Sequence, residues 1–183
     1  RFRSVTRGYV QEVNINNCSD EGILVASSCI SCVFEDILAL NCLLDITQAA
    51  KIGVVDIDGT DHFLSRVEAT TSQAALSDAN AYLCGILVRG DNNFIADCIG
   101  ELSDEGMHFA SGASLNRIDN CRADLNFGHG FNVIGSSNQF SNCLGLNNSQ
   151  ETTNTYDNWR FDSSSANNMT SNSQAISNVA NVA

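Results

Sequence analysis

The amino-acid sequence predicts an all-β fold in which short parallel strands stack as the coils of a β-helix. Three observations predict it: a repeat of about 22 residues, period-2 alternation of apolar residues inside short segments, and no long stretch of helical periodicity. One such unit cannot bury its own apolar face, whereas stacked units share a continuous core. We therefore expect about seven coils of about 22 residues, each with three short strands.

The clearest repeat is a six-residue template that reads Asn, any residue, an apolar residue, any residue, Asp or Asn, and Cys. It occurs at 93–98 (NFIADC), 116–121 (NRIDNC) and 138–143 (NQFSNC), with weaker copies at 61–66 (DHFLSR) and 167–172 (NNMTSN). Asn tolerates left-handed backbone geometry, so the template is expected at a bend. His62 occupies a variable position of the weak copy and is expected at the surface.

The cysteines of the three strong copies share one phase of the repeat. Stacking therefore predicts Cys98, Cys121 and Cys143 in a single inward-facing column, where each acts as a small hydrophobic residue. The sequence leaves open whether these thiols are free or bridged, because a disulfide needs a particular side-chain torsion. Cys84 stands directly before a repeat element and is given no role.

A second element precedes each template and has two apolar residues flanking one that points outward. Examples are GILV at 85–88, GMHF at 106–109 and GFNV at 130–133. Neighbouring strands lie ~4.8 Å apart, so outward residues of equal phase become neighbours in space. The predicted outward row is Leu24, Asp56, Leu87, His108, Asn132 and Arg160.

The coil length, the three strands per coil and the Asn at a bend resemble the right-handed parallel β-helix proteins of the pectate-lyase-like class. The resemblance covers roughly residues 8–172 and implies right-handed winding. Architectural relatives include pectate and alginate lyases, polysaccharide epimerases and phage tailspikes, which are trimeric, so a homotrimer is left open. No basic doublet and no calcium-binding set of Asp residues stands at positions that match the lyases.

Residues 1–183 are expected to form a single β-helix domain, and a start without Met suggests a fragment of a longer chain. Two long connections, at about 68–83 and 145–157, are expected as inserted loops on one side of the solenoid. Insertions on one face of a solenoid commonly form its binding face. We therefore predict that these loops are the walls of a groove.

The floor of the predicted groove carries the candidate site residues. Asp104, Glu105, His108 and His129 are the candidate catalytic groups, and Asn132, Asp157 and Arg160 are the candidate substrate-binding groups. A carboxylate pair with neighbouring His and Arg suits glycoside hydrolysis, or elimination from a uronate polysaccharide. The alternative is that these residues are solvated groups on the outer face of an acidic protein.

Composition limits the classes of partner. The formal net charge of −12 repels nucleic acid and anionic membranes, and no apolar stretch is long enough for a membrane span. No metal site and no cofactor are expected, with calcium as the one ion left open. The expected function is recognition of a polysaccharide, with cleavage left open, by an extracellular or surface-associated protein of a virion or cell envelope. The alternative is a non-enzymatic spacer or adhesin segment of a larger surface protein.

Overall fold

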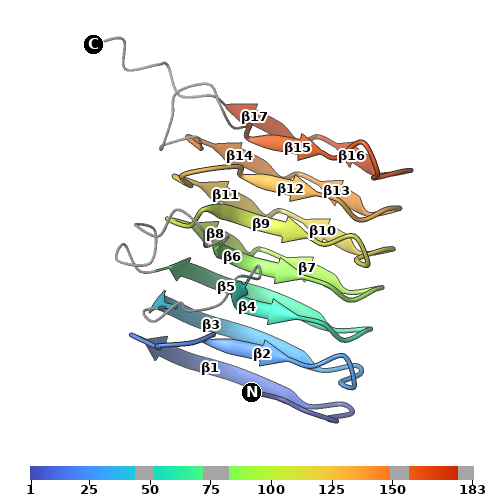
Figure 1. Ribbon diagram of the computed structural model, residues 1–183. Helices are drawn as coiled ribbons and strands as arrows, with labels where there is room; N and C mark the ends of the chain where they lie inside the picture. The colour runs from blue at the N-terminus through green and yellow to red at the C-terminus, as the bar shows by residue number, and fades with distance from the viewer. Residues whose placement is uncertain (44–51, 72–82, 149–156, 177–183) are drawn as a thin grey trace.

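The computed structural model describes residues 1–43, 52–71, 83–148 and 157–176. These residues form an all-β parallel solenoid of about five turns, rather than the seven expected, and contain no helix. Accordingly, no helix within the described ranges is long and apolar enough to cross a membrane. Figure 1 shows the coils stacked in sequence order from the N-terminal to the C-terminal end.

The coils are built from two parallel sheets. The larger sheet contains β1 (Tyr9–Asn16), β3 (Val33–Cys42), β5 (Phe63–Thr71), β7 (Phe94–Ala96), β8 (Ile99–Glu101), β10 (Arg117–Asp119), β11 (Arg122–Asp124), β13 (Gln139–Ser141), β14 (Leu144–Leu146), β16 (Met169–Ser171) and β17 (Gln174–Ile176). The smaller sheet contains β2 (Ile23–Val25), β4 (Ile52–Ile57), β6 (Leu83–Val88), β9 (Glu105–Phe109), β12 (Phe131–Val133) and β15 (Trp159–Phe161), each hydrogen-bonded to the next. The apolar core includes inward side chains of both sheets.

The Asn template lies on the larger sheet, where its first residue forms a buried ladder. The Asn116 side chain accepts the Asn93 N–H at 2.8 Å, and the Asn138 side chain accepts the Asn116 N–H at 3.0 Å. Each of these bonds runs from one coil to the next. The ladder therefore satisfies backbone groups that the bend removes from strand pairing.

Left-handed geometry occurs at the fifth template residue and not at the first. Asp97, Asn120 and Asn142 have φ values of 54°, 51° and 54°. In β5, the equivalent position is Arg66, with φ 54°, and the strand continues through it. The predicted bend is confirmed, and its place in the template is corrected.

The uniform period of about 22 residues holds only between the strong copies. The ladder bonds join residues 23 and 22 apart in the middle coils, but 31 apart from His62 to Asn93 and 30 apart from Asn138 to Asn168. Longer connections between these coils explain the lower number of turns.

The two weak template copies, as predicted from the sequence, lie one residue out of phase with the strong copies. Leu64 pairs with Ile95, and Thr170 pairs with Phe140. His62 is therefore a ladder residue, 1% exposed, whose Nδ1 accepts the Cys32 N–H at 3.0 Å. The expectation of a surface histidine was wrong because a one-residue slip moves a side chain to the other face of a strand.

The predicted cysteine column is confirmed by the register of its neighbours. The strands that precede and follow Cys98, Cys121 and Cys143 pair coil by coil, and all three side chains are at most 1% exposed. None of the eight cysteines, all of which lie in the described ranges, forms a disulfide bond. Burial raises the pKa of Cys121 well above its ordinary value, in keeping with a neutral thiol in the core.

The ladder should be a major source of stability. We expect Asn116→Leu to lower the free energy of unfolding by at least about 2 kcal/mol, because the buried Asn93 N–H and Gly90 O lose their partners. Urea denaturation measures the change. The matched control is Asn14→Leu on the exposed side of β1, expected within about 0.5 kcal/mol of the parent. Equal stability of the two variants would contradict a structural role for the ladder.

Candidate functional site

The outward row predicted from the second element is confirmed on the smaller sheet. The strand registers place each member of the row opposite the next, in the order Leu24, Asp56, Leu87, His108, Asn132 and Arg160. Asp56 is 3% exposed and forms an ion pair with Arg89, Nε to Oδ1 3.1 Å. Burial raises the pKa of Asp56, and the Arg89 guanidinium opposes this rise.

A second outward row runs beside the first, three residues earlier in each coil. Cys84 pairs with Glu105, and the backbone N–H groups of Gly106 and Gly130 donate to the carbonyls of His129 and Asp157 on the next coil. Glycine is required after Glu105 and after His129, because the backbone there passes close to buried amides. A Cβ on Gly106 would lie 2.5 Å from Asn126 Nδ2, and one on Gly130 would lie 2.5 Å from Asn148 Nδ2.

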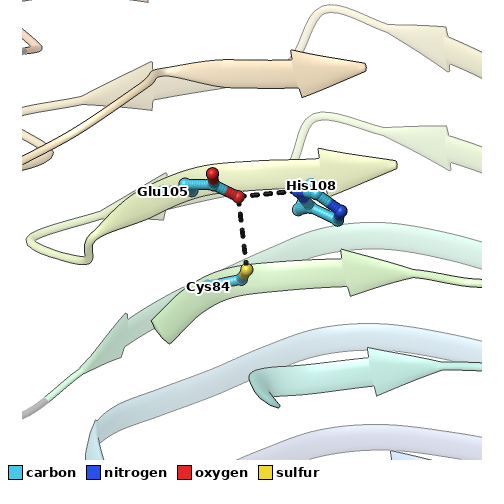
Figure 2. A group of neighbouring side chains, drawn as sticks. All are labelled: Cys84, Glu105 and His108. Carbon is cyan, nitrogen blue, oxygen red and sulfur yellow. Dashed lines mark hydrogen bonds and ion pairs between the residues drawn. The ribbon is translucent and has the colours of Figure 1, made fainter. Parts of the chain in front are cut away.

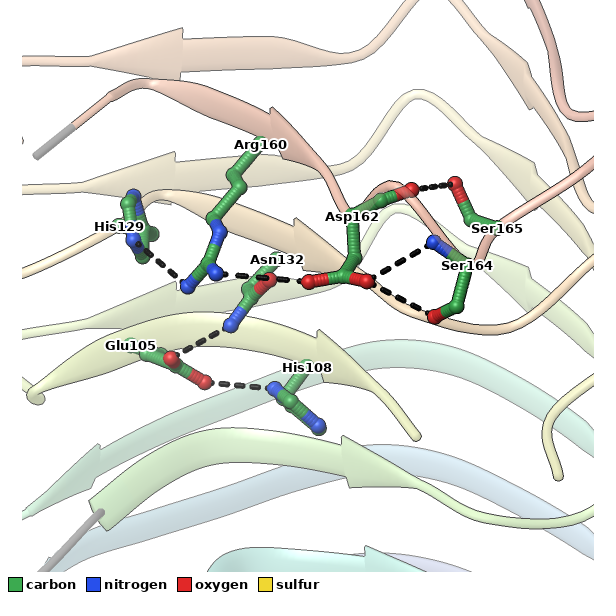
Figure 3. A network of polar contacts seen from close by, with 8 residues as sticks. All are labelled: Glu105, His108, His129, Asn132, Arg160, Asp162, Ser164 and Ser165. Atoms are coloured by element: carbon green, nitrogen blue, oxygen red, sulfur yellow. Dashed lines mark hydrogen bonds and ion pairs between the residues drawn. The ribbon is translucent and has the colours of Figure 1, made fainter. Parts of the chain in front are cut away.

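Glu105 is the centre of a buried polar cluster, which we call the Glu105 cluster: Cys84, Glu105, His108 and Asn132. Glu105 Oε2 lies 2.6 Å from His108 Nδ1, and Glu105 Oε1 accepts a bond of 2.6 Å from Asn132 Nδ2 (Figure 3). The Cys84 thiol donates to Oε2 at 3.7 Å. Exposure is 4% for Glu105, 2% for His108 and 1% for Asn132. A carboxylate this buried is tolerated as an anion only with such partners.

A second contact, between His129 and Arg160, lies on the two following coils. His129 Nδ1 accepts the Asp157 N–H at 3.0 Å, so the neutral ring carries its proton at Nε2. Arg160 Nη1 lies 3.4 Å from that Nε2, and Nη2 lies 3.4 Å from Asp162 Oδ2 (Figure 3). The Ser164 N–H and hydroxyl bond to Asp162 and lower the pKa of its carboxyl group.

His129 is held in its neutral form. Burial lowers its pKa below 6.5, and Arg160 lowers it further, while the charges of Glu105 and Asp157 act in the opposite direction. The ring is thus a hydrogen-bond donor at Nε2 near neutral pH. Arg160 and Asp157 beside it are exposed, so this contact reaches the surface.

The structure therefore brings six of the seven predicted site residues into two adjoining groups. Asp104 lies on the bend before β9, where its carbonyl oxygen accepts the Gly128 N–H at 2.7 Å. The alternative of solvated side chains does not describe Glu105, His108, Asn132 and His129, each at most 7% exposed. The predicted walls, about 68–83 and 145–157, lie mostly outside the described residues, so the groove stays a prediction.

Cys84 is the site residue that sequence reasoning missed. It precedes Gly85 as Glu105 precedes Gly106, so the phase of the second element already placed the two residues in one row. The sequence gives no chemical reason to expect that the Cys84 thiol contacts the Glu105 carboxylate, because a single cysteine before a glycine is common in purely structural positions.

Comparisons of this chain with protein-family models, with curated proteins and with solved structures found no match. The functional reading therefore depends on the geometry of the site.

His129 should make stability depend on pH. Its pKa is lowered by folding, so the unfolded chain binds a proton below about pH 6.5 that the folded chain does not, and stability falls as pH falls. We expect the parent to lose free energy of unfolding more steeply than His129→Gln between about pH 7.5 and 5.5. Urea denaturation at several pH values measures both curves. Parallel curves would contradict the assignment.

Proposed function

We propose that this chain is a pectate-lyase-like surface β-helix, wound right-handed with three strands per coil, and that it recognises a polysaccharide. The proposed binding surface is the outer face of the smaller sheet. The observation that carries the proposal is the contact between His129 and Arg160, beside the exposed Asp157. It gathers hydrogen-bond donors and acceptors from neighbouring coils at one place on the surface.

The chemistry of these side chains suits sugars. A sugar hydroxyl both donates and accepts hydrogen bonds, and Arg, Asp and His side chains offer fixed donors and acceptors in planar groups. Backbone pairing of β12 with β15 holds Asn132 opposite Arg160, so these two side chains stand on paired strands. Rigid placement lowers the entropic cost of binding a flexible polymer.

Cleavage of the polysaccharide is the second candidate, and the contact between Glu105 and His108 favours it. A buried carboxylate 2.6 Å from an imidazole is suited to transfer a proton to or from a bound sugar. Hydrolysis of a glycoside would require a second carboxyl group, and Asp104 is the adjacent candidate. Elimination would require only one base, with the Arg160 guanidinium to neutralise a uronate and the neutral His129 ring to donate a hydrogen bond to it.

A spacer or adhesin segment is the non-enzymatic alternative. The Glu105 cluster favours it in one respect, because its polar groups are buried and bonded to one another. Such a network can serve to hold two coils in register without touching any ligand.

Glycan-array binding distinguishes recognition from a spacer. We expect Arg160→Ala to bind the glycan that the parent chain binds on the array at least tenfold more weakly, a loss of about 1.4 kcal/mol in binding free energy. Arg160 is exposed, so the variant should fold as the parent does. The matched control is Arg117→Ala, an exposed arginine of β10 on the larger sheet, which should bind like the parent. Absence of glycan binding by the parent, or equal binding by all three proteins, would support the spacer.

A reducing-sugar assay, on the glycan that the parent chain binds on the array, tests cleavage separately. Glu105→Gln keeps the size of the side chain and should abolish product formation, because the amide cannot exchange a proton in this role. Glu101→Gln at the end of β8 is the matched control and should cleave at the rate of the parent. Binding without any product from the parent would leave recognition as the function and remove catalysis.

A further inference from the structure

Three chemically different side chains of the Glu105 cluster come together on β6 and β9. Each of Cys84, Glu105 and His108 offers one ligand atom, and these three atoms lie within 4.8 Å of one another (Figure 2). Register places Cys84 opposite Glu105, and His108 follows three residues later on the same strand. All three residues are buried, with Cys84 fully covered.

These atoms are the donors that a transition metal prefers. Thiolate, imidazole and carboxylate are the usual protein ligands of Zn²⁺, which takes four ligands in a tetrahedron. Calcium and magnesium instead require six or more oxygen ligands, which a thiol and an imidazole do not provide. The donor set therefore selects against calcium, the one ion that the sequence leaves open.

The distances are close to those of a tetrahedral site. Ligand bonds of about 2.0 to 2.3 Å place neighbouring donor atoms about 3.5 Å apart. The contact from Cys84 Sγ to Glu105 Oε2, at 3.7 Å, already has this length. The contact from Glu105 Oε2 to His108 Nδ1, at 2.6 Å, is a hydrogen bond and must open by roughly 0.8 Å to admit a metal.

Charge balance supports the same ion. A divalent cation with one thiolate, one carboxylate and one neutral imidazole has zero net charge, which suits a buried position. Binding would release the Cys84 thiol proton to solvent, and the neutral His108 ring would carry its one proton at Nε2, so that Nδ1 is free to coordinate. No electron transfer is needed.

We propose that Cys84, Glu105 and His108 form a zinc site with ligands Sγ, Oε2 and Nδ1. The three residues leave a fourth tetrahedral position, which water takes in zinc sites with three protein ligands. The site joins β6 to β9, so the metal would add a link between two neighbouring coils. The proposal does not depend on polysaccharide binding, and its test uses no glycan.

The test is a titration of the reduced chain, residues 1–183, with Co²⁺ followed by displacement with Zn²⁺. We expect one equivalent of Co²⁺ to give thiolate-to-cobalt charge-transfer absorption in the near ultraviolet, and Zn²⁺ to remove it. Cys84→Ser should lose the band and bind Zn²⁺ at least about 100-fold more weakly, since loss of even an outer-shell partner costs 10- to 100-fold. Cys18→Ser, a half-buried thiol outside the cluster, should keep both.

Two results would overturn the proposal. One is a parent chain with no charge-transfer band in excess Co²⁺, which decides the matter without any variant. The other is a band that persists in Cys84→Ser or disappears in Cys18→Ser. Circular dichroism checks that each variant folds, and His108→Gln is a second variant that should weaken Zn²⁺ binding by the same factor while all eight thiols remain.

Discussion

Parallel backbone pairing between successive coils is the constraint on which the rest of this structure depends. It holds each residue opposite the residue of equal phase in the next coil, so that positions 21 to 31 residues apart become neighbours. The buried ladder through Asn93, Asn116 and Asn138 adds side-chain bonds along the same direction. A slip of one residue would break these bonds and also turn every outward side chain into the core. Register is therefore strongly specified, and columns of side chains follow from it.

The outer face of the smaller sheet uses this constraint to place charged groups where water is largely excluded. Glu105 is stable there because His108, Asn132 and Cys84 surround its carboxylate. One coil later, His129 is kept neutral by burial, although two carboxylates act to protonate it. The site thus has a covered part, suited to hold a proton or a cation, and an edge at Arg160 that is open to a larger ligand. Both parts depend on the same two rows.

Much of the fold could be predicted because the strong template copies repeat without insertion. Between Asn93 and Asn138 the observed ladder has the predicted spacing, and the outward row was predicted residue by residue. The prediction failed at the weak copies, where longer connections precede the template. His62 and Asn168 take the ladder position there, one residue away from the predicted phase. Apolar residues alternate with period 2, so the pattern looks the same after an alignment is shifted by an even number of residues. A shift by one residue is also missed when one substituted residue makes the wrong alignment look apolar at the expected position.

The sequence by itself determined which residues of the strong template copies and of the second element share a phase, and therefore which of them are stacked, since alternation and repeat length are local properties of the chain. Burial, charge state and contact geometry were decided only by the tertiary structure. Nothing near Glu105 in the sequence shows that its carboxylate is covered, or that the thiol of Cys84 reaches it. Desolvation is the sum of contributions from every coil around a group, and those coils come from distant parts of the chain. For that reason a row of polar residues could be predicted, but not the buried cluster that it forms.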